Sequence, residues 1–261
     1  MNIVWLASEV VPFAKTGGLA DVSGALPEAL ARRGHQVSVI LPWYPQVTGK
    51  LNLEFDSHID MLPVPLGDFT EWASIRKLSS LHKNLTFYFI EFNRFFDRPA
   101  LYDWSGSEYA DNAQRFIFFS RACMQAILKL GLEPDILHCN DWHSALACVY
   151  LRSDLYCHEP GFSHCRSVLS IHNIGYQGIF HKDNLYWTGL GWQYFNSDCL
   201  EFYDQLNLLK AGIMTADQVN AVSPTYAQEI LSPEFGFALD PALRHRAYHG
   251  ALRGIINGID V

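Results

Sequence analysis

Short apolar runs alternate along this chain with longer segments whose apolar residues recur every three or four positions. The run Ile3–Ala7 predicts a buried strand, and the apolar positions from Val22 to Leu30 have helical spacing, with Asp21 as a plausible cap. The next apolar run, Gln36–Leu41, predicts a second buried strand. A strand, a helix and a second strand in this order predict a βαβ unit with parallel strands.

Residues 52–92 depart from this pattern. Their apolar runs are short, rich in β-formers and separated by Pro, Gly, Asp and Asn, which is typical of strands joined by turns. We expect a β-meander attached to the main sheet, with strands at Leu53–Phe55, Ile59–Leu62, Thr70–Ile75 and Leu85–Phe92.

Alternating elements resume after the meander. Ser105 with Glu108 has the spacing of a capping box and predicts the start of a long helix that ends at Gly131. The pattern then predicts strands at Asp135–His138, Ser167–Ile171, Gln218–Val222 and Leu252–Ile256, and helices at Ser144–Leu151, Asp204–Thr215 and Pro224–Leu231. We therefore expect an α/β fold, a Rossmann-like doubly wound parallel sheet that forms one domain over residues 1–261.

Composition narrows the class of protein. Apolar types make up 49% of the 261 residues, enough for a large core, and the formal net charge of −8 argues against general binding of nucleic acid or anionic membranes. No apolar run approaches the ~20 residues of a membrane span, and the first residues read as a strand rather than a signal peptide. Six cysteines without a C-x-x-C pair predict reduced core thiols, as in a cytoplasmic protein.

In a doubly wound sheet the ligand lies outside the carboxyl ends of the strands. Lys15, Gly17 and Gly18 follow the first predicted strand and precede its helix. Glycines let a ligand approach the backbone, and a lysine at a helix N-terminus suits a phosphate or diphosphate. The order of a P-loop is not present, and a plain solvated turn is the alternative interpretation.

Polar residues also follow two later strands. Asp141 and His143 come after the strand that ends at His138, and His172 and Asn173 come after the strand that ends at Ile171. Such side chains could bind sugar hydroxyls in one crevice, or simply be satisfied polar groups in turns. Five aromatic residues in loop-like stretches could form a glucan-facing surface or anchor loops on the core: Tyr102, Trp104, Trp187, Trp192 and Tyr194.

Two sharper alternatives concern cysteine. A zinc site could use the adjacent Cys-His pairs at Cys157, His158, His164 and Cys165, although their spacing is not that of usual zinc ligands. Cys139 could be a nucleophile, but no activating base is evident beside it. A serine nucleophile is disfavoured because the G-x-S-x-G elbow is not present.

Six motifs in order resemble the bacterial glycogen synthases and plant starch synthases of glycosyltransferase family 5. They lie at 15–27 (Lys-Thr-Gly-Gly-Leu-Ala-Asp-Val to Gly-Ala-Leu-Pro), 138–143 (His-x-x-Asp-Trp-His), 170–178 (Ser-Ile-His-Asn-Ile-x-Tyr-Gln-Gly), 209–212 (Leu-Lys-Ala-Gly), 222–226 (Val-Ser-Pro-Thr-Tyr) and 256–260 (Ile-Asn-Gly-Ile-Asp). The resemblance spans residues 3–260 and implies the N-terminal half of a GT-B glycosyltransferase, a fold in which two Rossmann-like domains face a cleft.

The resemblance implies an enzyme that transfers glucose from ADP-glucose, or from UDP-glucose, to the non-reducing end of an α-1,4-glucan with retention. It implies catalytic roles for His172 and Asp141, and neither a cofactor nor a metal. It implies substrate-binding roles for Lys15, Gly17, Gly18, Asp21, Tyr102, His143, Asn173 and Asn257.

The family's second half, a C-terminal nucleotide-binding domain, is not among these residues. We therefore expect the 261 residues alone to be inactive and to need that domain as a partner. A bacterial cytoplasm is the expected location, and a plastid stroma the alternative. A non-catalytic module that binds glucan or a partner protein, or a different GT-B glycosyltransferase, are the other functions that the sequence leaves open.

Overall fold

A computed structural model describes residues 1–45, 51, 53–80 and 82–258 of the chain. In this part of the chain, nine strands form one sheet in the order β14-β13-β9-β8-β1-β2-β5-β4-β3. Pairing is parallel from β14 to β5 and antiparallel from β5 to β3. The strands are β1 (Asn2–Leu6), β2 (Gln36–Pro42), β3 (Ser57–Leu66), β4 (Phe69–Ser79), β5 (Leu85–Glu91), β8 (Ile136–Asn140), β9 (Arg166–Ile171), β13 (Gln218–Ala221) and β14 (Leu252–Gly254).

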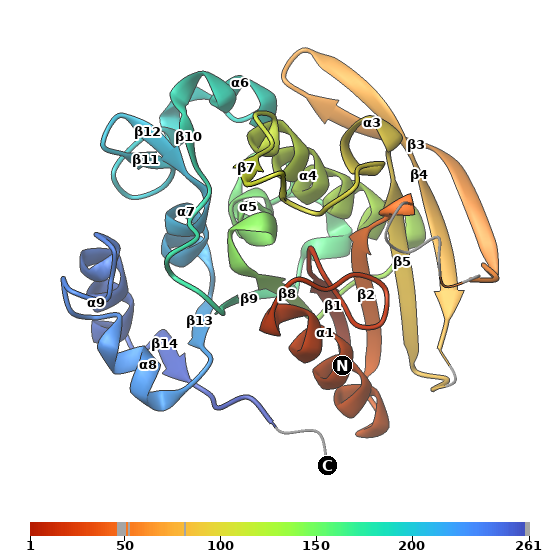
Figure 1. Cartoon of the computed structure of the whole chain (residues 1–261), viewed down its shortest axis with the longest axis horizontal. Helices are drawn as coiled ribbons and strands as arrows, with labels where there is room; N and C mark the ends of the chain where they lie inside the picture. The colour runs from red at the N-terminus through yellow and green to blue at the C-terminus, as the bar shows by residue number, and fades with distance from the viewer. Residues whose placement is uncertain (46–50, 52, 81, 259–261) are drawn as a thin grey trace.

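Helices cover both faces of this sheet, so the predicted doubly wound α/β fold is confirmed (Figure 1). Alternate residues of β1 explain the two layers: Trp5 packs with the core beneath α1 (Gly18–Arg32), whereas Leu6 packs with the core on the other face. That second core lies against α4 (Asn112–Leu130), α5 (Asp141–Arg152) and α7 (Leu208–Thr215).

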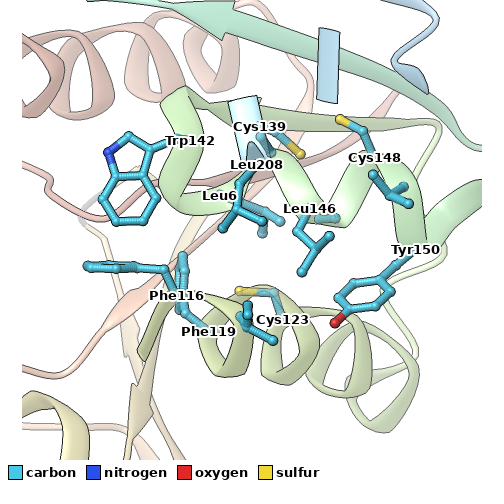
Figure 2. Close-up of a cluster of buried hydrophobic side chains, with 14 of the residues drawn as sticks. Leu6, Phe116, Phe119, Cys123, Cys139, Trp142, Leu146, Cys148, Tyr150 and Leu208 are labelled. Carbon is cyan, nitrogen blue, oxygen red and sulfur yellow. The ribbon is translucent and has the colours of Figure 1, made fainter. Parts of the chain in front are cut away.

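The larger core lies between α4, α5 and the sheet (Figure 2). Phe116 and Phe119 of α4 meet Leu146 of α5 and Leu208 of α7, and all four are fully buried. Burial of each such side chain stabilises the fold by about 1.5–3 kcal/mol. Five of the six cysteines are buried free thiols, as predicted, but Cys157 is exposed.

The meander extends the main sheet through β5, which pairs with β2. The run Leu53–Phe55 was expected to form one of its strands, and this prediction is wrong. Phe55 instead packs edge-on against Trp43 and Phe89, with ring centroids 5.2 and 5.5 Å apart, so the run is a loop anchored on the core. The outer strand β3 carries two prolines and is irregular between Ile59 and Leu62.

Two predicted helix starts are wrong for the same reason. Ser105 does not cap α4, because Ser105 and Gly106 have positive φ and form the turn between β6 (Asp103–Trp104) and β7 (Ser107–Glu108). The helix predicted from Asp204 begins only at Leu208, since Tyr203 and Asp204 form a similar turn between β11 (Glu201–Phe202) and β12 (Gln205–Asn207). Short hairpins replace the first helical turns.

The remaining elements are short. They are α3 (Asn93–Phe96), β10 (Ile179–His181), α6 (Leu185–Thr188), α8 (Pro224–Glu229), α9 (Asp240–Tyr248) and 3₁₀ turns at Pro160–Phe162, Lys182–Asn184 and Trp192–Tyr194. Of these elements, the sequence pattern predicted only α8. Among the helices that the structure describes, none is both long and apolar enough to cross a membrane.

Candidate functional site

The glycine loop after β1 is held by a buried carboxylate that sequence reasoning missed. Glu9 is 4% exposed and accepts hydrogen bonds from the backbone N–H of Thr16 (2.5 Å) and Gly17 (3.1 Å) and from the Thr16 hydroxyl. Its Oε1 also accepts the Tyr102 hydroxyl at 3.0 Å. Glu9 thus fixes the loop that leads into α1. An acidic residue three positions after the end of a buried strand is the sequence signal that could have indicated it.

Space is open around the two glycines of this loop. A Cβ placed on Gly17 or Gly18 would meet no described atom within 4 Å, and neither residue has a positive φ. Packing and backbone conformation therefore do not require glycine at either position. An open approach to the backbone at the N-terminus of a helix is what an anionic or sugar ligand needs.

Lys15 lies at the start of the loop and is paired with Asp21. The Lys15 Nζ lies 2.6 and 2.8 Å from the two carboxylate oxygens, and both side chains are about half exposed, at 54% and 52%. Asp21 is not the cap of α1, because the helix begins at Gly18 and Asp21 lies in its first turn. An exposed ion pair of this kind is weak, so Lys15 can exchange Asp21 for a ligand.

Tyr102 and His143 form a second part of the site. Their rings stack with centroids 4.5 Å apart, and the Tyr102 hydroxyl contacts both Glu9 and the Ser8 hydroxyl, the latter at 2.6 Å. His143 is buried, and its Nδ1 has no hydrogen-bond partner among the described atoms. Burial, with the nearby Arg115 charge, holds the pKa of His143 well below its usual value, so the ring is neutral.

Asp141 lies at the N-terminus of α5, which begins directly after β8 and not at Ser144 as predicted. Its Oδ1 accepts the backbone N–H groups of His172 (2.7 Å) and Asn173 (3.5 Å), and this contact joins the ends of β8 and β9. Burial raises the pKa of Asp141 to about 7, although the two N–H groups act in the opposite direction. These contacts are those of a residue that positions His172.

His172 has a defined protonation state and tautomer. Burial lowers the pKa of His172 to about 4, so its ring is neutral near pH 7. Its Nε2 lies 3.0 Å from Oδ1 of Asn140, whose amide is oriented by a 2.9 Å hydrogen bond from Nδ2 to the carbonyl of Leu6. Nε2 must therefore carry the proton, which leaves Nδ1 as an acceptor.

Most of the predicted residues come together, and one stands apart. Contacts link the glycine loop to Tyr102 and His143 through Glu9, and link Asp141 to His172 and Asn173. Asn257 is exposed beyond β14, and β13, β9 and β8 separate that strand from β1. The end of the 256–260 motif lies outside the described residues.

Burial and spacing decide between the alternatives for the loop aromatics, the Cys-His pairs and Cys139. Trp187 and Tyr194 pack against the core, whereas Trp104 and Trp192 are exposed. In the described part of the chain, no three His, Cys, Asp or Glu side chains are grouped so that they could hold a metal, the Cys157–Cys165 segment included. Burial raises the pKa of the Cys139 thiol well above its usual value, which disfavours a nucleophilic thiolate.

Gly178 sets the position of Trp142, which precedes His143. Gly178 has φ +64°, and a Cβ there would lie 2.5 Å from the Trp142 ring. We expect Gly178→Ala to lower the free energy of unfolding by about 3 kcal/mol or more, the sum of backbone strain and overpacking. Denaturant unfolding measures this loss of free energy.

Gly106→Ala is the matched control. Gly106 has φ +82°, but nothing lies within 4 Å of a Cβ there, so only the backbone strain, about 1–2 kcal/mol, should appear. Equal losses in both variants would contradict the packing argument.

Comparison with known proteins now identifies the domain. The family model described as the starch synthase catalytic domain matches residues 2–245. The chain belongs to the starch synthase catalytic domain family. Two glycogen synthases match all of it: that of Rhodopirellula baltica is 44% identical over 272 residues, and that of Koribacter versatilis is 45% identical over 260 residues.

A solved structure shows that the starch synthase fold extends over the whole domain. The catalytic domain of starch synthase IV from Arabidopsis thaliana, bound to ADP and acarbose, matches 99% of this chain with a TM-score of 0.87 and 32% identity. The chain covers 52% of that structure and 52% of each of the two glycogen synthases. It thus spans about half the length of the relatives that it matches.

Proposed function

We propose that this domain binds ADP-glucose and forms one wall of the site of a retaining α-1,4-glucan synthase. One observation carries the proposal: a buried carboxylate, Glu9, holds open the glycine loop of the family motif beside the strand ends that present Asp141 and His172. The relatives named glycogen synthase and the starch synthase bound to ADP support this choice of donor and acceptor.

The loop is suited to the diphosphate of the donor. Lys15 supplies an exposed cation, and the open space at Gly17 and Gly18 admits a phosphate close to the N-terminus of α1. A helix N-terminus and a lysine both favour negative charge. We propose that Asp21 keeps Lys15 in place until the donor binds.

The neutral histidine is suited to the donor sugar. Nδ1 of His172 is an acceptor and would bind a glucose hydroxyl, and Asn173 is exposed beside it. Asp141 would act by holding the backbone of these two residues. Tyr102 and His143 would shape the floor between the loop and the sugar. As the family resemblance implies, Asn257 would bind the substrate from its exposed position beyond β14.

A second domain would complete the enzyme. The relatives are about twice as long as this chain, and Lys15 brings a cation to an edge that also holds Glu9, Asp21 and Asp141. We propose that the rest of the positive charge for the diphosphate comes from the C-terminal half, as the family resemblance implies. A bacterial cytoplasm is the proposed location, and UDP-glucose is the alternative donor.

A chimera tests the function. This chain replaces the matching half of the Rhodopirellula baltica glycogen synthase, and label transfer from ADP-glucose to glycogen is measured. We expect transfer with the unchanged chain. Lys15→Ala should raise the donor KM by about 10- to 100-fold, since a charge-assisted hydrogen bond contributes about 1.5–3 kcal/mol.

Lys83→Ala is a control, because Lys83 lies just before β5, outside the strand-end site, and its loss should leave the donor KM unchanged. Lys15→Arg should restore the KM only in part, because a planar guanidinium needs a different geometry. A donor KM unaffected by Lys15→Ala would remove Lys15 from the site, and a folded chimera without transfer would contradict the proposed function.

A further inference from the structure

A surface groove lies where the β3–β4 hairpin meets α6, outside the site described above. It has a volume of about 530 Å³. Figure 1 shows the tip of the hairpin reaching α6 along the top of the molecule. Gly189 brings the two parts together, since a Cβ there would lie 3.6 Å from the backbone nitrogen of Gly67.

The walls of the groove are aromatic. Trp192 is 64% exposed, and its ring is held edge-on by Phe195 at 5.4 Å between centroids. Tyr186 is half exposed, stacks on Phe69 and hydrogen-bonds to Asp68 through its hydroxyl. Gly67, with φ +58°, makes room for the Tyr186 ring, because a Cβ there would lie 2.9 Å from it. Both rings are therefore fixed at the surface, with much of their area open to solvent.

The charge of the groove selects its ligand. Asp68 and Asp183 line it, and no lysine or arginine is among the described residues that do. Two carboxylates repel a phosphate or a nucleotide but accept hydrogen bonds from hydroxyl groups. Apolar ring faces with a few polar acceptors are typical of small-molecule sites of this size. The lining thus matches a neutral ligand with many hydroxyls and an apolar face.

We propose that this groove is a second binding site for the α-glucan, separate from the strand-end site. The choice of glucan rests on the proposed function, because the groove by itself selects only a neutral carbohydrate. A glucan chain offers apolar ring faces to Trp192 and Tyr186 and hydroxyls to Asp68 and Asp183. A second contact with one polymer raises avidity for branched glucan without changing the affinity of the strand-end site for a short acceptor.

Native electrophoresis of the 261-residue chain through gels with graded glycogen tests this site. We expect the unchanged chain to be retarded and Trp192→Ala to weaken its affinity for glycogen about tenfold or more. Trp72→Ala is the matched control: Trp72 is 52% exposed on the same hairpin but does not line the groove, so retardation should stay unchanged. Asp183→Ala, a change at a surface side chain, should also weaken the affinity for glycogen. Melting curves check that each variant is folded.

The outcomes separate this site from the proposed function. Lys15→Ala should be retarded like the unchanged chain, and added ADP-glucose should not release the glycogen. Equal retardation of the Trp192→Ala and Trp72→Ala variants, or no retardation of the unchanged chain, would overturn the second site. Failure of the proposed function would instead appear as loss of transfer from ADP-glucose to a short maltooligosaccharide in the chimera, which does not require the groove.

Discussion

Assayed alone, the 261-residue chain should transfer no measurable glucose from ADP-glucose to glycogen. The strand-end site brings the carboxylates of Glu9, Asp21 and Asp141 to the sheet edge that holds Lys15, whose charge is already paired with Asp21. A leaving diphosphate needs compensating positive charge, and the loss of one stabilising group in a transition state costs about 10²–10³ in kcat. Two or more missing groups should reduce transfer by at least about 10⁴-fold.

The measurement is label recovered in precipitated glycogen, with the chimera described above as the positive control. The isolated chain should be folded, with a cooperative thermal transition, because a cluster of buried apolar side chains lies on each face of the sheet. Transfer by the isolated chain at a rate near that of the chimera would mean that its own residues stabilise the diphosphate. The proposed division of labour between two domains would then be wrong.

Acid should unfold the domain steeply. Burial lowers the pKa of His138 to about 3 and of His172 to about 4, and holds that of His143 well below its usual value. In the unfolded chain these rings take up protons near pH 6.5. The folded state does not bind these three protons, because its rings stay neutral. The contribution of the neutral rings to the free energy of unfolding is therefore fully present above pH 6.5 and is lost as the pH falls towards 4.

Asp141 opposes part of this effect. Its pKa is raised to about 7 in the folded protein, against about 3.9 when unfolded, so between pH 6 and 4 the folded state holds one extra proton. The net difference is 3 − 1, or about two protons, which lowers the free energy of unfolding by about 3 kcal/mol per pH unit in this window. Over the two pH units from 6 to 4 the loss is about 5–6 kcal/mol, which equals the lower end of a typical stability of about 5–15 kcal/mol.

Denaturant unfolding at pH 7.5, 6, 5 and 4.5 measures this slope. His138→Gln should reduce the slope by about one proton, because it removes one of the three titrating rings. Ser163→Ala, a change at an exposed side chain that does not titrate, is the control and should leave the slope unchanged. A free energy of unfolding that stays constant from pH 7 to 4.5 would contradict the assignment of three neutral buried histidines.

Long elements were predictable because periodicity is local information. The face of α4 that includes Ala113, Phe116 and Met124 has helical spacing in the sequence and is buried in the structure. The two hairpins at Ser105–Gly106 and Tyr203–Asp204 did not follow from periodicity, since strands of two or three residues have no period, and the second turn contains no glycine. The sequence pattern of these two segments instead predicts the beginnings of helices.

The candidate site was predictable as a set of strand ends but not as a set of contacts. The position of Lys15, Asp141 and His172 after three strands follows from the pattern alone. The role of Glu9 does not, because its partners Thr16 and Tyr102 are brought to it by the loop and by tertiary packing. The same holds for the tautomer of His172, which depends on an asparagine amide fixed by another strand.

The prolines and the irregularity of β3 have a consequence for how this protein behaves at high concentration. β3 is the last strand on its side of the sheet, and Pro63 and Pro65 pair with β4. Prolines fit an edge strand at positions where the missing N–H would face solvent, so β3 lacks two outward hydrogen-bond donors at Pro63 and Pro65. The bulge after Ile59 bends the strand. On the other side β14 has only three residues. Both edges of a sheet of nine strands are thus poor templates for a strand from another molecule, and the domain is protected against edge-to-edge aggregation.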